Sequence, residues 1–380
     1  MRRRINWALM TENNGISREQ ENIVLSESDA AVDNRGELNK AGTPPARVRP
    51  LWHGVLVWLA VCVAYVGIGM AGFIELWFIT PFVFALVVSQ VLETRMWTRF
   101  FIGIVAIFLA LLTVVLGILI LVWREAWLPD EPSTYTIAIF LIVLGSLVLP
   151  CLVRGARARL FSVIGLNQDS TLHTTASVMF VLTVVSCGGI FVLLLEDPGE
   201  TIFLDLKDPI ISLLSDVPLA LAGVGLMLRR DFKQSIERLG FVSMKWREFG
   251  WAVVVTLPFI LVVLLFDSAE ELLLPEIHAL EDRFPMEFRN VSAIFGIPAI
   301  SLAAGLGEEA VFRGALQPRF GIVLTALLFA AVHVQYQLPG IFLIFIIGIF
   351  LGVLRKRKST TFTACVHMVY DVIALSLPDF

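Results

Sequence analysis

Ionisable and aromatic side chains recur at a spacing of four residues inside apolar stretches near the C-terminal end of the chain. The pairs are Glu309 with Arg313, Phe329 with His333, and His367 with Asp371. Residues four apart lie on one face of an α-helix, so each pair would present its polar or aromatic edge in one direction. Charged groups in a membrane are costly and are functional candidates by default. These pairs are therefore the first places to look for chemistry.

The two adjacent glutamates, Glu308 and Glu309, are predicted to have different roles. On a helix, Arg313 is placed to neutralise Glu309, whereas Glu308 points about 100° further round and has no such partner on its own helix. A carboxylate outside an ion pair is suited to accept a proton from water as a general base. We therefore predict a structural role for the pair Glu309–Arg313 and the chemical role for Glu308.

The depths of the candidate groups agree when they are measured along their helices. With the chain turning at Phe320, Glu308 lies roughly 18 Å below the turn and His333 roughly 20 Å below it, at 1.5 Å per residue. His367 lies roughly 14 Å below the basic run that ends at Lys358. Three separate segments thus place reactive groups at a similar depth, which predicts that Glu308, His333 and His367 converge on one polar cavity.

The elements that position these groups are predicted to be membrane-spanning helices. The chain of 380 residues is 57% hydrophobic and only 16% charged, whereas soluble domains carry about 25% charged residues. Most of its apolar segments approach the roughly 20 residues that a helix needs to span the hydrocarbon layer. The segments are Leu51–Ile74, Leu76–Leu92, Phe100–Trp123, Tyr135–Val153, Thr174–Leu195, Pro209–Leu228, Phe249–Phe266, Val291–Gln317, Phe320–Tyr336, Leu338–Leu354 and Phe362–Leu377. The predicted fold is an all-α, polytopic bundle of about 11 transmembrane helices.

The loops between these segments alternate in charge. Basic residues follow every second segment, for example the run from Arg355 to Lys358, and the intervening loops are acidic. Basic loops stay in the cytoplasm. The alternation predicts a multi-pass protein, with its N-terminus in the cytoplasm and its C-terminus outside. We expect its location to be the cell (plasma) membrane.

Three regions are predicted along the chain. Residues 1–47 are polar and read as a disordered cytoplasmic tail, residues 51–200 as a transmembrane region of unknown role, and residues 205–380 as the catalytic core. The stretch 229–249 has the composition of an interfacial helix. Asp216 is isolated in its segment and is interpreted as structural. The four cysteines show no metal-type or disulfide-type spacing.

The order of these motifs resembles that of the CPBP family, which includes the type II CAAX prenyl proteases and the bacterial lysostaphin-resistance and bacteriocin-immunity (ABI) relatives. The family pattern is E-E-x-x-x-R, F-x-x-x-H and H-x-x-x-(N or D) on successive membrane helices. Here it is matched by the residue pairs above, with Glu308 as the first glutamate. The first 200 or so residues are not covered by the resemblance.

The resemblance implies a glutamate-dependent intramembrane endopeptidase. Glu308 with His333 would activate a water, His367 and Asp371 would stabilise the oxyanion, and Phe329 would shape the pocket. Asp371 stands where the eukaryotic enzymes have an asparagine, and an ionised aspartate accepts hydrogen bonds but donates none. Asp371 could donate if burial raises its pKa and keeps it protonated, or it could orient His367 instead.

A metal mechanism is an alternative, with Glu308, His333, His367 and Asp371 as the ligand set. We expect no cofactor, because carboxylate and imidazole together can activate a water. The expected partners are membrane lipids and a protein or peptide substrate, with no nucleic acid. The main competing function is a non-proteolytic membrane partner or bacteriocin-immunity-type protein with the same fold. A transporter is a third reading, but no inverted repeat supports it.

Overall fold

The structure is a computed structural model of the chain. It describes residues 51–70, 73, 75–93, 96–127, 132–196, 202–204, 207–281, 286–288, 293–334 and 336–376. The disordered tail predicted for residues 1–47 and parts of the acidic loops lie outside these residues. Residues from Arg49 to Phe380 form one compact unit.

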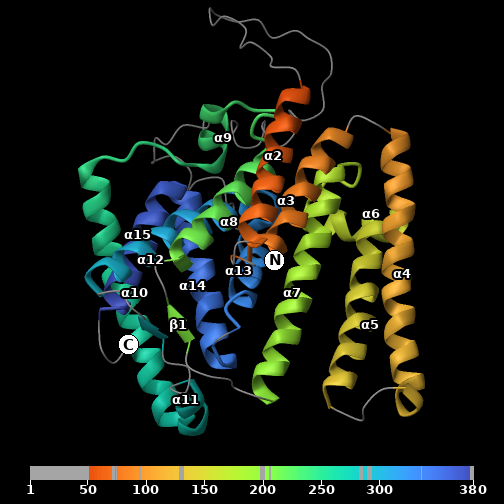
Figure 1. Cartoon of the computed structure of the whole chain (residues 1–380). Helices are drawn as coiled ribbons and strands as arrows, with labels where there is room; N and C mark the ends of the chain where they lie inside the picture. Colours follow the sequence, from red (N-terminus) through yellow and green to blue (C-terminus); the bar gives the residue numbers. More distant parts are fainter. Residues whose placement is uncertain are drawn as a thin grey trace, which may run out of the picture. The chain divides into compact units, whose positions relative to one another are not determined.

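Every apolar segment of the sequence falls on a helix, which confirms the predicted helical bundle (Figure 1). The first six helices are α2 (Leu51–Met70), α3 (Glu75–Leu92), α4 (Met96–Trp127), α5 (Pro132–Leu152), α6 (Arg154–Ile164) and α7 (Thr171–Glu196). The later ones are α8 (Lys207–Val224), α9 (Phe232–Leu239), α10 (Trp246–Leu273), α11 (Pro275–Glu281), α12 (Ala293–Glu308), the π-helix η2 (Glu309–Leu316), α13 (Gln317–Ala331), α14 (Leu338–Arg357) and α15 (Thr360–Ala374).

Seven helical stretches among the described residues are long and apolar enough to cross a membrane. One of them, Phe295–Ala331, runs through α12, η2 and α13 and contains two of the segments that the sequence separates at Phe320. The described residues also contain a short parallel pair of strands, β1 (Ile202–Leu204) with β2 (Met286–Phe288). It links the chain ahead of α8 to the chain ahead of α12.

The chain reverses direction within this long stretch, at Gly321. The backbone of Gly321 has φ 73° and ψ −179°, a conformation that L-residues with a side chain rarely adopt. The rings of Phe312 and Phe329 lie on either side of this point with their centroids 5.1 Å apart. In a straight helix, residues at this separation would be about 25 Å apart. The predicted turn at Phe320 is therefore a helical hairpin that closes one residue later.

The interfacial helix predicted for residues 229–249 is shorter in the structure. Asp231 and Gln234 form a capping box at the start of α9, and Gly240 ends the helix in the left-handed region at φ 83°. The Thr360 hydroxyl donates a hydrogen bond of 2.6 Å to the carbonyl of Leu239. This bond ties the end of α9 to the first residue of α15, the helix that carries His367.

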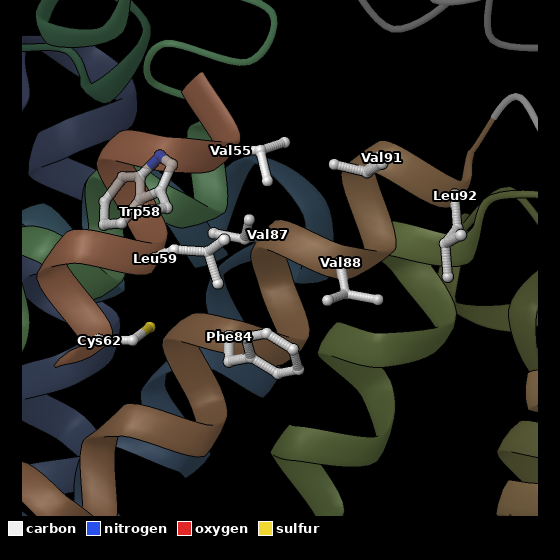
Figure 2. A pocket seen from close by; sticks show the side chains of 9 residues that line it. All are labelled: Val55, Trp58, Leu59, Cys62, Phe84, Val87, Val88, Val91 and Leu92. Carbon is white, nitrogen blue, oxygen red and sulfur yellow. The ribbon is translucent and has the colours of Figure 1, made fainter. Parts of the chain in front are cut away.

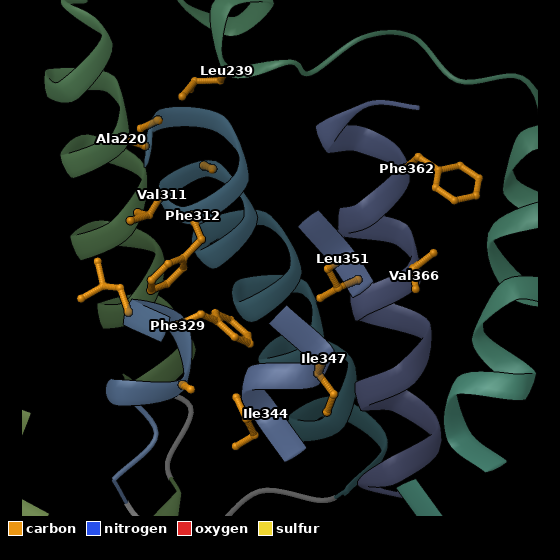
Figure 3. Close-up of a cluster of buried hydrophobic side chains, with 14 of the residues drawn as sticks. Ala220, Leu239, Val311, Phe312, Phe329, Ile344, Ile347, Leu351, Phe362 and Val366 are labelled. Carbon is orange, nitrogen blue, oxygen red and sulfur yellow. The ribbon is translucent and has the colours of Figure 1, made fainter. Parts of the chain in front are cut away.

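The largest buried cluster of apolar side chains joins α8, η2, α13, α14 and α15 (Figure 3). A second cluster packs α2, α3 and α7 against α8 through Trp58, Val83 and Ala222. The indole nitrogen of Trp58 also donates a hydrogen bond of 2.8 Å to the carbonyl of Leu226. Helices α2, α3 and α7 of the region 51–200 therefore pack directly on the helices that carry the candidate site.

Candidate active site

Glu309 is the buried centre of an ionic network. Its Oε1 lies 3.3 Å from Nη1 of Arg313 and 3.1 Å from Nδ1 of His367. The side chains of Glu309 and Arg313 are 0% and 1% exposed. The i, i+4 ion pair expected from the sequence is present, but the sequence does not indicate the additional contact with His367. Glu309 thus links η2 to α15 as well as neutralising Arg313.

His367 lies between two carboxylates. Its Nδ1 faces Glu309, and its Nε2 lies 3.7 Å from Oδ1 of Asp371, one turn further along α15. The two carboxylates fix the orientation of the imidazole ring. The contact with Asp371 is longer than an ordinary hydrogen bond, so the proton on Nε2 is not committed to Asp371.

Phe329 on α13 lies between η2 and α15 and is close to Arg313, His333 and His367. The guanidinium carbon of Arg313 lies 4.2 Å from the centroid of its ring, a cation–π distance. The rings of His333 and His367 lie 4.8 Å and 6.1 Å from the same centroid. Figure 3 shows the Phe329 ring beside that of Phe312 on η2. The aromatic ring therefore connects both histidines to the ion pair.

The tautomer of His333 follows from its hydrogen bond. Its Nδ1 lies 2.7 Å from the carbonyl oxygen of Phe329. A carbonyl oxygen only accepts, so Nδ1 carries the proton and donates it. With the proton on Nδ1, Nε2 is the ring nitrogen that can present a lone pair as a proton acceptor. This is the state that a general base or a water-holding group requires.

Glu308 differs from its neighbour in being left without a close partner. Its Oε2 is buried and has no hydrogen-bond partner in the described part of the chain. It interacts electrostatically with Arg313 on η2 and with His367 and Asp371 on α15. The chemical role of Glu308 and the structural role of Glu309 stay predictions.

A cavity of about 370 Å³ opens beside Glu308. Its walls come from α3, α7, α8, α13 and the segment 308–319, and they are mostly apolar. A second hollow, of about 310 Å³, lies between α2 and α3 and is lined by apolar side chains and Trp58 (Figure 2). No ionisable side chain other than Cys62 lines this second hollow among the described residues. Of the residues predicted to converge on one polar cavity, Glu308 lines the cavity of about 370 Å³, whereas His333 and His367 are not among its lining residues.

Asp216 on α8, which the sequence interpretation treats as structural, lies close to Glu308 in the structure. It lines the same cavity as Glu308 and interacts with it electrostatically. A Cβ atom on Gly307 would lie only 2.9 Å from Oδ2 of Asp216, so the side chain is packed against the turn that carries Glu308. The available signal was its position as an acid inside an apolar segment.

The backbone that carries these groups departs from the α-helix. Residues Glu309–Leu316 form a π-helix, and seven of its residues, Glu309 to Ala315, are buried. Such segments are rare and occur frequently at functional sites. Helix α12 ends at Glu308 and η2 begins at Glu309, so the two glutamates lie on either side of the change in helical geometry.

The metal ligand set considered from the sequence does not gather in the structure. The described residues contain no group of three or more histidine, cysteine or acidic side chains placed to hold a metal ion. Both ring nitrogens of His367 face carboxylates, and Nδ1 of His333 is bonded to a carbonyl. Glu308, His333, His367 and Asp371 are thus not arranged as a common coordination shell.

The part of the chain that holds these groups was compared with known families. Residues 290–373 match a family model. The family is described as type II CAAX prenyl endopeptidase Rce1-like. The match spans the motif residues from Glu308 to Asp371, and it confirms over this segment the resemblance seen in the sequence. Searches of curated proteins and of solved structures found no match.

The extent of this match separates the site into two parts. The residues of η2, α13 and α15 around Phe329 lie inside the matched segment, whereas Asp216 and the cavity walls from α3 and α7 lie outside it. The segment is therefore similar to that of an intramembrane CAAX-type protease. The cavity walls that α3, α7 and α8 contribute have no counterpart in the matched segment.

Proposed function

We propose that the protein is an intramembrane endopeptidase in which Glu308, together with His333, activates a water for attack on a peptide bond. The observation that carries the proposal is that Glu308, with its Oε2 buried, forms no hydrogen bond or ion pair among the described residues. Its neighbour Glu309 is engaged by both Arg313 and His367. The similarity of residues 290–373 to the type II CAAX prenyl endopeptidases supports the same reaction class.

In the proposed mechanism, Glu308 accepts a proton from water while the water oxygen bonds to the carbonyl carbon. The proton then passes to the departing amine nitrogen as the carbon–nitrogen bond breaks. His367 would donate from Nε2 to the negative oxygen of the tetrahedral intermediate, a role typical of oxyanion donors. Asp371 would orient His367 electrostatically, since its Oδ1 lies 3.7 Å from Nε2, and would leave the Nε2 proton free for the substrate oxygen.

The remaining groups would hold these side chains in place. Glu309 and Arg313 would fix the position of His367 from the adjacent helix. Phe329 would form the wall between His333 and Arg313, since it contacts both. The substrate would be a membrane-associated protein or peptide, because the apolar cavity beside Glu308 is built from helices of a membrane bundle.

The function is tested with the full chain reconstituted in proteoliposomes. Release of the C-terminal tripeptide from a farnesylated CAAX peptide would be measured, and membrane proteins would be profiled for new termini. We expect cleavage by the wild type and none by Glu308→Gln. The matched control is Glu237→Gln, which makes the same change on the exposed side of α9 and should leave cleavage unchanged.

Two results would overturn parts of this proposal. Full activity in Glu308→Gln would assign the base to another residue. A folded wild type that cleaves neither the farnesylated peptide nor any membrane protein would favour the non-proteolytic partner or immunity-type function.

A further inference from the structure

Asp216 is a buried carboxylate without a cation committed to it in the described structure. Its hydrogen-bond partner is the Ser212 hydroxyl, one turn earlier on α8, at a long 3.4 Å. The arginine nearest along η2, Arg313, is paired with Glu309. Arg319, which also lines the cavity, donates instead to the carbonyls of Ala315 and Gly223. A structural ion pair therefore does not account for Asp216.

The cavity has few polar groups with which to hold a water. A buried water typically makes about three hydrogen bonds and takes up about 30 Å³. The cavity of about 370 Å³ has ample room, but Glu308 alone offers one side chain. The other polar side chains on its walls are Asp216, Thr183 and the engaged Arg319. Asp216 is the one that packs against Gly307, next to Glu308.

We propose that Asp216 is a positioning residue of the active site, which holds the attacking water against Glu308 inside this cavity. The proposal rests on the proposed peptidase function. Asp216 accepts one hydrogen of the water while Glu308 accepts the other and removes it. The water oxygen then keeps a lone pair free to attack the substrate carbonyl carbon. Ser212 holds the Asp216 carboxylate through its hydroxyl.

This arrangement gives the region outside the matched segment a role in the reaction. Asp216 belongs to α8, and its side chain reaches the turn at Gly307 because glycine leaves the space free. An alanine there would bring a methyl group to 2.9 Å from the Asp216 oxygen. The glycine before Glu308 is thus required for the two carboxylates to share the cavity.

The kinetic test compares Asp216→Asn with the wild type in proteoliposomes, using the farnesylated CAAX peptide or a substrate found by profiling. Asparagine keeps the shape of the side chain, but it removes the charge and replaces one acceptor oxygen with an NH₂ donor, which would turn the water away from the position that Glu308 requires. A misplacement of about 1 Å can reduce a rate by about 100-fold, so we expect kcat to fall by about that factor with KM unchanged. Asp208→Asn on the same helix is the matched control and should change neither constant.

The stability of each variant separates positioning from folding. Melting in detergent should give the same midpoint for Asp216→Asn and the wild type. A large fall in the melting midpoint with unchanged kcat per folded molecule would assign Asp216 a structural role and overturn the proposal. Unchanged kcat and unchanged stability would overturn it as well, while leaving the proposed peptidase function intact.

A second measurement does not depend on activity. A cryo-EM map of the full chain at a resolution that shows ordered waters should contain a water between the carboxylates of Asp216 and Glu308. This water should be lost in Asp216→Leu. A lipid chain in this position, or a dry contact, would overturn the proposal. An inactive wild type would overturn the peptidase function and this role of Asp216 together.

Discussion

The helices α4 and α5 expose apolar side chains on their surfaces, whereas the less apolar helices η2 and α15 bury polar side chains against each other. On α4, large apolar side chains face outward, and Phe108 and Val122 are 62% and 67% exposed. On η2, all residues from Glu309 to Ala315 are buried, including both members of an ion pair. Figure 1 shows α4 and α5 side by side, away from α15.

The two pairs of helices are held together by different kinds of contact. Helices α4 and α5 approach each other through glycines: a Cβ on Gly117 or Gly145 would lie within 2.7 Å of the carbonyl of Ala138 or Ala110. Small residues at the contact are typical of helix pairs in membranes. Helices η2 and α15 are joined instead by charge, through Glu309 and His367. Substitutions in the two regions should therefore have different consequences.

The largest effect on activity is expected from Glu308→Gln. Removing a general base typically costs about 10²–10⁴-fold in rate, and Glu308 has no close ion-pair partner to leave unpaired. Cleavage per folded molecule should therefore collapse while the melting temperature stays near that of the wild type. Loss of folded protein in proportion to activity would contradict the division of roles between the two glutamates.

The largest effect on stability is expected from Glu309→Gln. This change leaves Arg313 buried without its counter-charge, and breaking a buried pair in this way costs about 3–5 kcal/mol. Folded yield and melting temperature in detergent should both fall. Restoring stability with the double substitution Glu309→Gln and Arg313→Met would confirm that the unpaired charge is the cause. A wild-type melting curve for Glu309→Gln alone would be inconsistent with the network.

A smaller effect is expected from Phe329→Leu. Leucine keeps most of the apolar volume but removes the ring over which the Arg313 guanidinium lies at 4.2 Å. Cation–π contacts contribute about 0.5–2 kcal/mol, so the melting temperature should decrease moderately and activity should decrease as both histidines lose their ring contact. Phe329→Tyr is the control, because its ring keeps the cation–π contact.

Metal removal should have little effect. A water activated by Glu308 and His333 requires no metal ion, so incubation with EDTA should leave cleavage by the reconstituted protein unchanged. Loss of activity that zinc restores would instead favour a coordination shell formed in a conformation other than this one.

The smallest effect is expected on α4. Phe108→Ala removes a ring that is 62% exposed on a helix with no charged partner at that position. Neither cleavage nor the melting temperature in detergent should change measurably. A loss as large as that of Phe329→Leu would mean that this face of α4 is covered by another protein rather than by lipid.

The helices were predictable from the sequence because length and hydropathy determine them. The segment boundaries, the turn near Phe320 and the ion pair Glu309–Arg313 all depend on residues close together in the chain. The contact between Glu309 and His367 was not predictable, because it depends on how η2 packs against α15. The same holds for Asp216, whose neighbour Gly307 lies on another helix, and for the π-helix, whose residues have no distinctive pattern.

The pairing of β1 with β2 also determines when the site can form during synthesis. The strands are parallel, with Ile202 opposite Met286, and parallel strands require a long connection between them. Here that connection contains α8, α9, α10 and α11. Contacts between residues so distant in sequence form late, since the intervening chain must be ordered first. The ribosome has therefore finished α8 with Asp216 long before Glu308 emerges, and the two carboxylates meet only as the last helices enter the bundle.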